Sequence, residues 1–194
     1  MNDIERIKRL YETHGTKPCG NGINQIEHAL QVARMAELGG ADEPLIAAAL
    51  LHDIGHLLYN DDVLAWNIND RHEVIGAGIL KPIFGVEVSE PVKLHVLAKR
   101  YLCAIDPMYY EGLSDASRKS LDLQGGQTLE PMKKTFFERN QFFSQAIELR
   151  LWDDQCSDSS AIDVDFDTYL PLLKSLHTGA ARHYASGSVC AAAR

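Results

Sequence analysis

Hydrophobic residues recur at helical spacing along most of the chain. The first apolar stripe consists of Ile4, Ile7, Leu10 and Tyr11, and its spacing of three and four residues predicts an amphipathic helix. Asn24 followed by Glu27 forms an asparagine variant of the capping box. This signal predicts a second helix over 24–38, which stops at the glycine pair that begins with Gly39.

The segment LIAAALLHDIGHLLY, residues 45–59, is apolar almost all round. This pattern predicts a buried central helix rather than a surface helix. Its polar residues are His52, Asp53 and His56, and they are therefore expected to face the interior or a cavity.

Further helices are predicted in the rest of the chain. They are expected over 72–84 with a break near Pro82, from Pro91 to before Pro107, from about Met132 to 156, and after Asp163. Between Tyr109 and Pro131 the sequence predicts a long polar connection with at most a short helix, and such loops are often functional. Strand-like alternation is nearly absent. The chain is therefore predicted to be all-α and one domain over 1–194, with about ten mobile residues at its end.

Composition narrows the classes of partner. The formal net charge is -8, from 27 acidic and 19 basic residues, and the basic residues are scattered, so neither nucleic acid nor an anionic membrane is an expected partner. No stretch approaches the roughly 18 uninterrupted apolar residues of a membrane span, and the N-terminus lacks the apolar core of a secretory signal. The four cysteines form no CxxC pair. These observations predict a cytoplasmic protein with reduced thiols.

Candidate chemistry centres on the adjacent pair His52 and Asp53. The chain has eight histidines, and five of them fall between His28 and His95. Burying a carboxylate costs several kcal/mol unless it is paired or binds a metal. Neighbours on one helix lie about 100° apart in projection, so both side chains could reach one ion. The alternative is a buried ion pair without a metal.

Four further positions favour a metal centre over that ion pair. His28, His72 and His95 each fall in a separate helical segment, and Asp153 ends the apolar run IELRLWDD. Imidazole together with carboxylate suits iron, manganese or zinc, and six ligands exceed what one catalytic ion with open positions needs. Two ions bridged by one carboxylate would use all six. Asp53 is the natural bridge, because it has two oxygens.

The order of these residues, with LLHDIGH in the middle and LRLWDD near the end, resembles the HD-domain superfamily. More narrowly, the chain is similar to the dinuclear-iron oxygenases of that superfamily, a group that includes myo-inositol oxygenase and the PhnZ/TmpB organophosphonate branch. The similarity to this branch extends over most of the chain. The matching segments are INQIEHALQVA, AALLHDIGH, RHEVIGAGIL, SRKSLDLQGG and LRLWDD.

The resemblance implies a helical HD-domain bundle with a dinuclear site in its core. It implies one iron held by His28, His52, Asp53 and Asp153, and a second held by Asp53, His72 and His95. The implied cofactor is a mixed-valent Fe(II)/Fe(III) pair. The implied reaction is oxidative cleavage of the C–P bond of a 1-hydroxyalkylphosphonate by O2, which releases phosphate and a carboxylic acid.

Residues around the open face suit an anionic substrate. Lys99, one helical turn after His95, supplies a positive charge, although the alternative is an ordinary surface lysine. His56, one turn after His52, is expected to donate a hydrogen bond to dioxygen or to substrate. The family pattern places the polar connection over the site. Its candidate donors are Ser120 and Gln124, with Ser117 as an alternative.

The identity of the phosphonate depends on the stretch before His28. The branch that acts on 2-amino-1-hydroxyethylphosphonate carries a Tyr and a Glu there, and the matching positions in this chain are Pro18 and Asn21. A primary ammonium would lose a charge-assisted hydrogen bond of about 1.5–3 kcal/mol, whereas a trimethylammonium has no N–H to donate. The expected substrate is therefore (R)-1-hydroxy-2-(trimethylammonio)ethylphosphonate, which would give glycine betaine and phosphate. Asn21 is kept as a candidate substrate-facing position.

Three alternatives stay open at this point. The first is the 2-amino-1-hydroxyethylphosphonate dioxygenase reaction, which gives glycine and phosphate. The second is a dinuclear HD phosphohydrolase, in which two metals activate water to attack a phosphate ester. A binding module without activity is disfavoured, because no ligand position has been lost. The oligomeric state is left open.

Overall fold

The computed structural model describes residues 1–20, 22–58, 71–156 and 163–178. Helices dominate these ranges, and the strands described are only β1 (Pro18–Gly20) and β2 (Ile23–Asn24), which pair antiparallel. The prediction of an all-α fold is confirmed. No helix in the described part of the chain is both long enough and apolar enough to cross a membrane.

The first two helices begin with capping boxes, of which the one at Asn24 was predicted. Helix α1 (Asp3–His14) and helix α2 (Gln25–Leu38) each start with a complete capping box, formed by Asn2 with Glu5 and by Asn24 with Glu27. In both boxes the asparagine side chain accepts a hydrogen bond from the backbone of the glutamate, and the glutamate side chain accepts one from the asparagine backbone. These reciprocal bonds satisfy amide groups that a helix start otherwise leaves unpaired.

The central helix is shorter than predicted. Helix α3 (Glu43–Leu51) ends before His52, and a 3-10 helix, η1 (Ile54–Leu58), follows. The prediction of one continuous helix over 45–59 is therefore wrong. Residue 59 lies outside the described ranges. Gly55 disfavours a continuous helix by about 1 kcal/mol relative to alanine. In η1 it packs closely on the start of α5, where an added Cβ would lie 2.2 Å from the carbonyl oxygen of His72. The His52–Asp53 pair consequently sits at a helix end, in a turn, rather than along a helix wall.

Helices α5 (His72–Phe84) and α6 (Val86–Ile105) both contain a proline. The predicted break near Pro82 falls slightly later, because α5 ends at Phe84 and Gly85 turns the chain with a φ of 87°. The predicted start at Pro91 is wrong, because α6 begins at Val86. Pro91 is the sixth residue of α6 and removes one internal hydrogen bond, that to the carbonyl of Glu87, but the helix continues through it.

The stretch between Tyr109 and Pro131 contains more helix than predicted. Helix α7 (Pro107–Gly112) is capped by Asp106, and helix α8 (Asp115–Leu123) is capped by Ser114. Caps of this type stabilise short helices whose composition is polar. The expectation of a mainly non-helical connection is therefore wrong.

The predicted helix from about Met132 to 156 is two helices. They are α9 (Pro131–Glu138) and α10 (Phe143–Asp153). Asn140 lies between them, and its side chain accepts a hydrogen bond of 2.8 Å from the backbone N–H of Phe142. Asparagine side chains favour turns through such local bonds, which explains the interruption.

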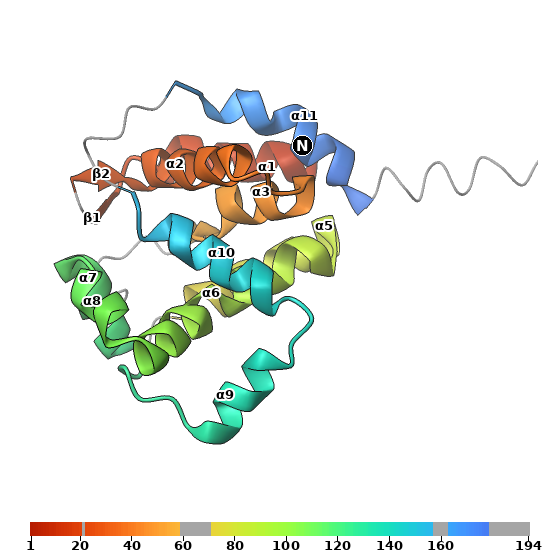
Figure 1. Cartoon of the computed structure of the whole chain (residues 1–194). Helices are drawn as coiled ribbons and strands as arrows, with labels where there is room; N and C mark the ends of the chain where they lie inside the picture. The colour runs from red at the N-terminus through yellow and green to blue at the C-terminus, as the bar shows by residue number, and fades with distance from the viewer. Residues whose placement is uncertain (21, 59–70, 157–162, 179–194) are drawn as a thin grey trace, which may run out of the picture.

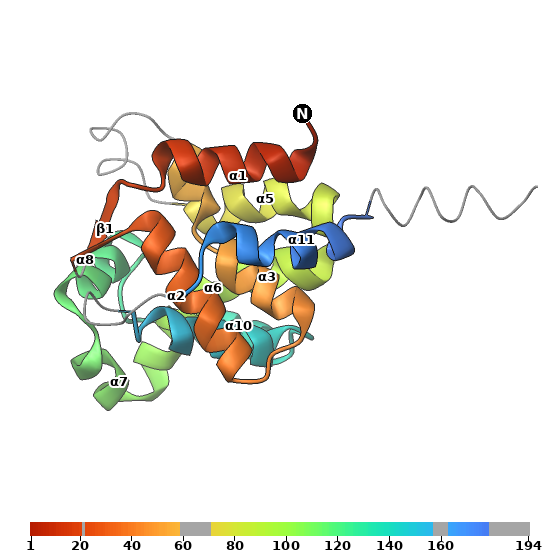
Figure 2. The same cartoon turned by 90° about the horizontal axis from the view of Figure 1, so that it is seen from above.

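Helix α6 lies at the centre of the bundle. It packs against α3, α5 and α10, and α2 packs against α3 and α10. In Figure 1, α1, α2 and α11 (Leu170–Leu176) lie in the upper part and α7 to α9 in the lower part, with η2 (Phe166–Tyr169) leading into α11. Figure 2 shows α11 beside α1 and α3 from above. The predicted helix after Asp163 is thus present as η2 and α11, and the predicted mobile end lies outside the described ranges.

Candidate metal centre

The six predicted ligands meet in the core although they come from distant parts of the chain. His28 comes from α2, His72 from the start of α5 and His95 from α6. His52 and Asp53 occupy the turn after α3, and Asp153 ends α10. The four histidines are buried, with His52 fully inaccessible to solvent. Tight packing of α3, α5, α6 and α10 therefore builds one polar cluster inside an apolar bundle.

The histidines form two pairs whose ring nitrogens face each other. His28 Nε2 lies 3.2 Å from His52 Nε2, and His72 Nε2 lies 3.1 Å from His95 Nε2. Adjacent ligand atoms at about 2.1 Å from one ion lie about 3 Å apart, so each pair has the spacing of neighbouring ligands.

Backbone carbonyls fix which nitrogen of two histidines is free to bind a metal. His52 Nδ1 donates to the carbonyl of Ala49 at 2.9 Å, and His95 Nδ1 donates to that of Val92 at 2.6 Å. When these rings are neutral, as metal ligands must be, the proton on Nδ1 leaves a lone pair on Nε2 in both. Metal-binding histidines usually donate the second ring nitrogen in this way. The donor chemistry of both pairs therefore fits a cation.

Asp53 lies between the two pairs. Its Oδ1 is 3.2 Å from His72 Nε2 and 3.8 Å from His95 Nε2. The same carboxylate reaches the other pair, with 3.5 Å from Oδ1 to His52 Nε2 and 3.7 Å from Oδ2 to His28 Nε2. Asp53 is therefore placed to bridge two ions, one at each histidine pair.

Asp153 belongs to only one pair. Its Oδ1 lies 3.1 Å from His28 Nε2 and 3.8 Å from His52 Nε2. The ligand set among the described residues is consequently uneven: the Nε2 atoms of one pair have two carboxylates beside them, and those of the other pair have Asp53. Glu73 Oε2 lies 3.9 Å from the other ring nitrogen of His72, Nδ1. An ion at His72 and His95 would keep more positions open for other ligands.

Both carboxylates are ionised despite their burial. Burial acts to raise the pKa of Asp53, but the charge of His52 and a hydrogen bond from His72 hold that pKa well below its usual value. For Asp153 burial is likewise overcome, first by Arg150 and then by His52, and the pKa is again held well below its usual value. Two buried negative charges among imidazoles are a suitable environment for cations.

Arg150 is a site residue that the sequence analysis missed. It is 4% exposed and contacts Asp153 Oδ2 through Nη1, on the side of the carboxylate away from His28. Its remaining nitrogens bind Asp154, with 3.0 Å between Nε and Oδ2. Tyr109 on α7 donates its hydroxyl to the same Asp154. The signal was available in LRLWDD, because residues three and four apart share a helix face.

Lys99 is buried beside this network. It is 2% exposed, so the alternative of an ordinary surface lysine is wrong. Its Nζ donates a hydrogen bond of 2.6 Å to Ser120 Oγ on α8. Burial, then the charge of Arg150, lowers the pKa of Lys99 to about 8. A buried ammonium next to a hydroxyl is a suitable receptor for an anion.

Four other residues were predicted to contact the substrate or to lie near it: His56, Gln124, Ser117 and Asn21. The ring of His56 stacks on that of His72 with 4.0 Å between centroids, and ring nitrogens of both lie within 4.8 Å of an Asp53 oxygen. Gln124 ends α8, and its Oε1 is buried with no hydrogen-bond partner among the described residues. Ser117 donates its backbone N–H to the cap Ser114. Asn21 lies outside the described ranges.

Comparison with known proteins agrees with the fold and the cluster. Residues 26–122 match the model of the HD-domain family. This range includes His28, the His52–Asp53 pair, His72 and His95, and the chain belongs to the HD-domain family.

Relatives within this family place the chain more narrowly. It is 44% identical over 156 residues to a hydroxymethylphosphonate dioxygenase from Gimesia maris, with 77% of each chain covered. It is 35% identical over 185 residues to a glycine-betaine-forming [1-hydroxy-2-(trimethylamino)ethyl]phosphonate dioxygenase from Leisingera caerulea, with 92% of this chain and 94% of that protein covered. An uncharacterized protein, L432, from Acanthamoeba polyphaga mimivirus is 34% identical over 160 residues, with 80% of this chain and 73% of that protein covered. The resemblance to the organophosphonate branch is confirmed.

Proposed function

We propose that this chain is a di-iron dioxygenase that cleaves the C–P bond of a 1-hydroxyalkylphosphonate. The main support is the arrangement of the four histidines. His28 faces His52 at 3.2 Å, His72 faces His95 at 3.1 Å, and Asp53 lies between these two pairs. The buried Lys99 one turn from His95 adds the positive charge that a phosphonate needs. The two relatives named as phosphonate dioxygenases support the same reaction class.

The proposed ligand set is that of the sequence analysis. His28, His52 and Asp153 hold one iron, His72 and His95 hold the other, and Asp53 bridges them. When bound, the iron pair supplies the redox chemistry that activates dioxygen. Mixed imidazole and carboxylate ligation is typical of non-heme iron sites, and it also suits manganese.

The protein side chains position the substrate in this proposal. Lys99 and Ser120 bind phosphonate oxygens, and Gln124 contributes an amide from the end of α8. His56, stacked on His72, donates a hydrogen bond at the open face. The apolar surfaces of α3 and α6 exclude water from the reacting carbon, which strengthens every charge–charge contact in the site.

The simplest reaction of this class balances without another co-reactant. Hydroxymethylphosphonate dianion and O2 give formate, hydrogen phosphate dianion and one proton. The C–P bond breaks, one oxygen atom is added to carbon and one to phosphorus, and the carbon is oxidised from the alcohol to the carboxylate level. A substituted 1-hydroxyphosphonate would give the corresponding carboxylate and phosphate.

Two substrates are favoured over 2-amino-1-hydroxyethylphosphonate, the substrate with a primary amine. The absence of an acid and a tyrosine at Asn21 and Pro18 supports the trimethylammonio substrate, as the sequence analysis expects. It equally supports hydroxymethylphosphonate, which has no ammonium to bind, and the 44% identity to a hydroxymethylphosphonate dioxygenase favours testing that substrate first.

A phosphate-release assay tests the proposal. Protein loaded with Fe(II) under ascorbate is given each of the three hydroxyphosphonates, with and without O2, and a phosphate monoester is run in parallel. Phosphate from a hydroxyphosphonate only when O2 is present supports the dioxygenase. Phosphate from the ester, or release that is independent of O2, supports the phosphohydrolase instead. Asn21→Glu tests the substrate argument, because a gain on the primary amine is expected.

A further inference from the structure

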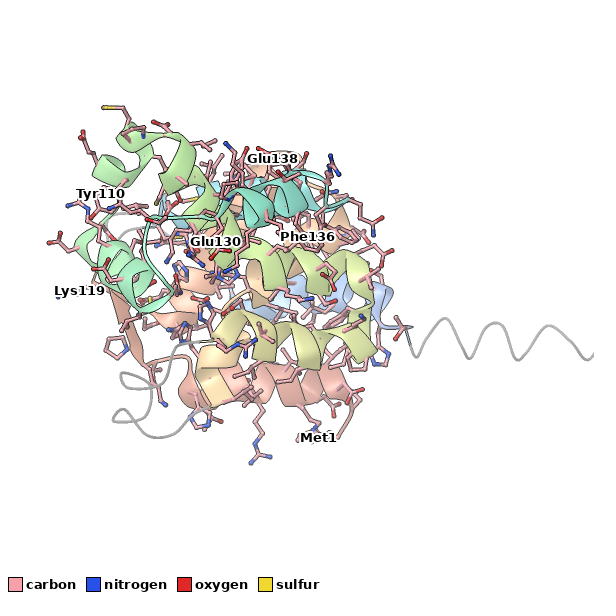
Figure 3. The ribbon with its side chains drawn as sticks, turned by 90° about the horizontal axis from the view of Figure 1, so that it is seen from below. Met1, Tyr110, Lys119, Glu130, Phe136 and Glu138 are labelled. Carbon is pink, nitrogen blue, oxygen red and sulfur yellow. The ribbon has the colours of Figure 1, made fainter. Side chains whose placement is uncertain are left out.

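The chain that leaves α8 makes a tight turn next to the predicted anion site. Residues 124–128 read QGGQT, with φ of 103° at Gly125 and 70° at Gly126. These backbone angles favour glycine. Figure 3 labels Lys119 on α8 and Glu130 at the start of α9, on either side of this segment. The turn begins with Gln124, one of the proposed substrate contacts.

Arg100 on α6 donates hydrogen bonds to three carbonyl oxygens of this turn. Its Nε donates to Gly126 at 3.1 Å, and its Nη2 donates to Gly125 at 3.1 Å and to Thr128 at 2.8 Å. A Cβ built on Gly125 would lie 3.2 Å from the guanidinium carbon, so the guanidinium rests directly against the turn. The guanidinium presents five donors in a fixed planar fork, whereas a lysine has three donors on a single nitrogen and cannot reproduce that geometry.

The neighbouring residue Lys99 is hydrogen-bonded to α8, just before this turn. Its ammonium donates to Ser120, four residues before Gln124. Consecutive residues of α6 therefore hold the start and the end of one stretch, residues 120–128. An incoming phosphonate must share Lys99 with Ser120, whereas the carbonyl partners of Arg100 are not groups that an anion would bind. Arg100 can thus keep its bonds while substrate enters.

We propose that Arg100 is the positioning residue that holds Ser120 and Gln124 against Lys99, and that it sets the affinity for the phosphonate group. The inference rests on the proposed function. Arg100 itself touches neither the substrate nor the metal ligands in this account. It acts by fixing the backbone of the turn, and a displaced donor that no longer reaches the phosphonate loses a charge-assisted hydrogen bond, which is about ten- to a hundredfold in affinity.

The variants needed to test this role are expected to fold. Helix α8 is also attached through an apolar cluster of Cys103, Leu113 and Leu121, which does not involve Arg100. Arg118 offers a matched control, because it too donates to a backbone carbonyl, that of Glu111, but it does not touch residues 124–128.

The experiment compares Arg100→Lys, Arg100→Ala and Arg118→Lys with the parent protein, all loaded with iron. Calorimetry without oxygen gives the Kd for hydroxymethylphosphonate, turnover with oxygen gives kcat and KM, and a colorimetric assay gives iron per chain. For both Arg100 variants Kd and KM should rise about ten- to a hundredfold, with kcat and iron content nearly unchanged. Added guanidinium should lower KM for Arg100→Ala, and Arg118→Lys should behave like the parent.

Each other outcome has a definite meaning. If the parent binds the phosphonate and the Arg100 variants bind it equally well, the positioning role is wrong. Loss of iron, or a lower kcat at unchanged KM, would show a general structural role and would also overturn it. If the parent binds none of the three hydroxyphosphonates, the proposed function fails, and this inference fails with it.

Discussion

Replacing Lys99 with methionine should make the metal-free protein more stable and the enzyme much less active. The side chain is 2% exposed, and burial followed by the charge of Arg150 lowers its pKa from 10.5 to about 8. At about 1.4 kcal/mol per pH unit, this fall corresponds to about 3 kcal/mol of destabilisation at neutral pH. Methionine has a similar length and carries no charge, so the variant avoids this penalty.

The expected net effect is smaller than the full penalty. Lys99→Met also loses the 2.6 Å hydrogen bond to Ser120, which is worth about 1 kcal/mol. At pH 7 the free energy of unfolding should therefore be about 2 kcal/mol higher for the variant than for the parent. Above pH 8 the difference should shrink, because the folded parent releases the Lys99 proton near pH 8 whereas the unfolded chain keeps it until about 10.5.

Urea unfolding of the metal-free proteins between pH 7 and 10 measures this difference, and phosphate release by the iron-loaded proteins measures activity. The kcat/KM for hydroxymethylphosphonate should fall at least about a hundredfold, as expected when a buried charged partner of an anion is removed. Lys93→Met is the matched control, because Lys93 lies on the same helix but is exposed. If Lys99→Met is less stable than the parent at pH 7, the charge of Lys99 does not destabilise the fold. If it is equally active, Lys99 does not bind the substrate.

Four further outcomes follow from the site. Gly55→Ala should destabilise the fold by about 1–3 kcal/mol in urea unfolding, because its Cβ would meet the His72 carbonyl at 2.2 Å, whereas Gly78→Ala, with nothing within 4 Å, should not. Asp53→Asn should reduce colorimetric iron from two ions per chain to at most one, because its carboxylate reaches both histidine pairs. Arg150→Lys should weaken iron binding about ten- to a hundredfold in chelator competition, since Arg150 holds Asp153. In pH profiles kcat/KM should fall above about pH 8 as Lys99 loses its proton, and Lys99→Arg should abolish that fall.

The sequence was informative where one local rule determines the outcome. The capping box at Asn24 predicts the start of α2, and the apolar stripe from Ile4 predicts α1. The apolar run around Ala48 predicts burial, and every residue from Leu45 to Leu51 is buried. Histidines and carboxylates in apolar segments could be grouped as one cluster, because such groups are rarely buried alone.

Tertiary packing determined what the sequence left undecided. The close fit of Gly55 in η1 against the backbone of His72 joins two residues that lie 17 positions apart in the sequence. Lys99 is bonded to Ser120 of α8, and the cap of that helix at Ser114 gave only a local signal. Arg150 was overlooked because an arginine on an amphipathic helix usually faces solvent, whereas here α10 packs against α2, α3 and α6 and Arg150 is buried.

The central claim is that this HD-domain site uses O2 to cleave a C–P bond, and one measurement tests it directly. Oxygen uptake and phosphate release are recorded together for the iron-loaded protein with hydroxymethylphosphonate and, in a second run, with the trimethylammonio substrate. The account predicts one O2 consumed for each phosphate released, and no phosphate when O2 is removed. Phosphate release at an undiminished rate without O2 would contradict it.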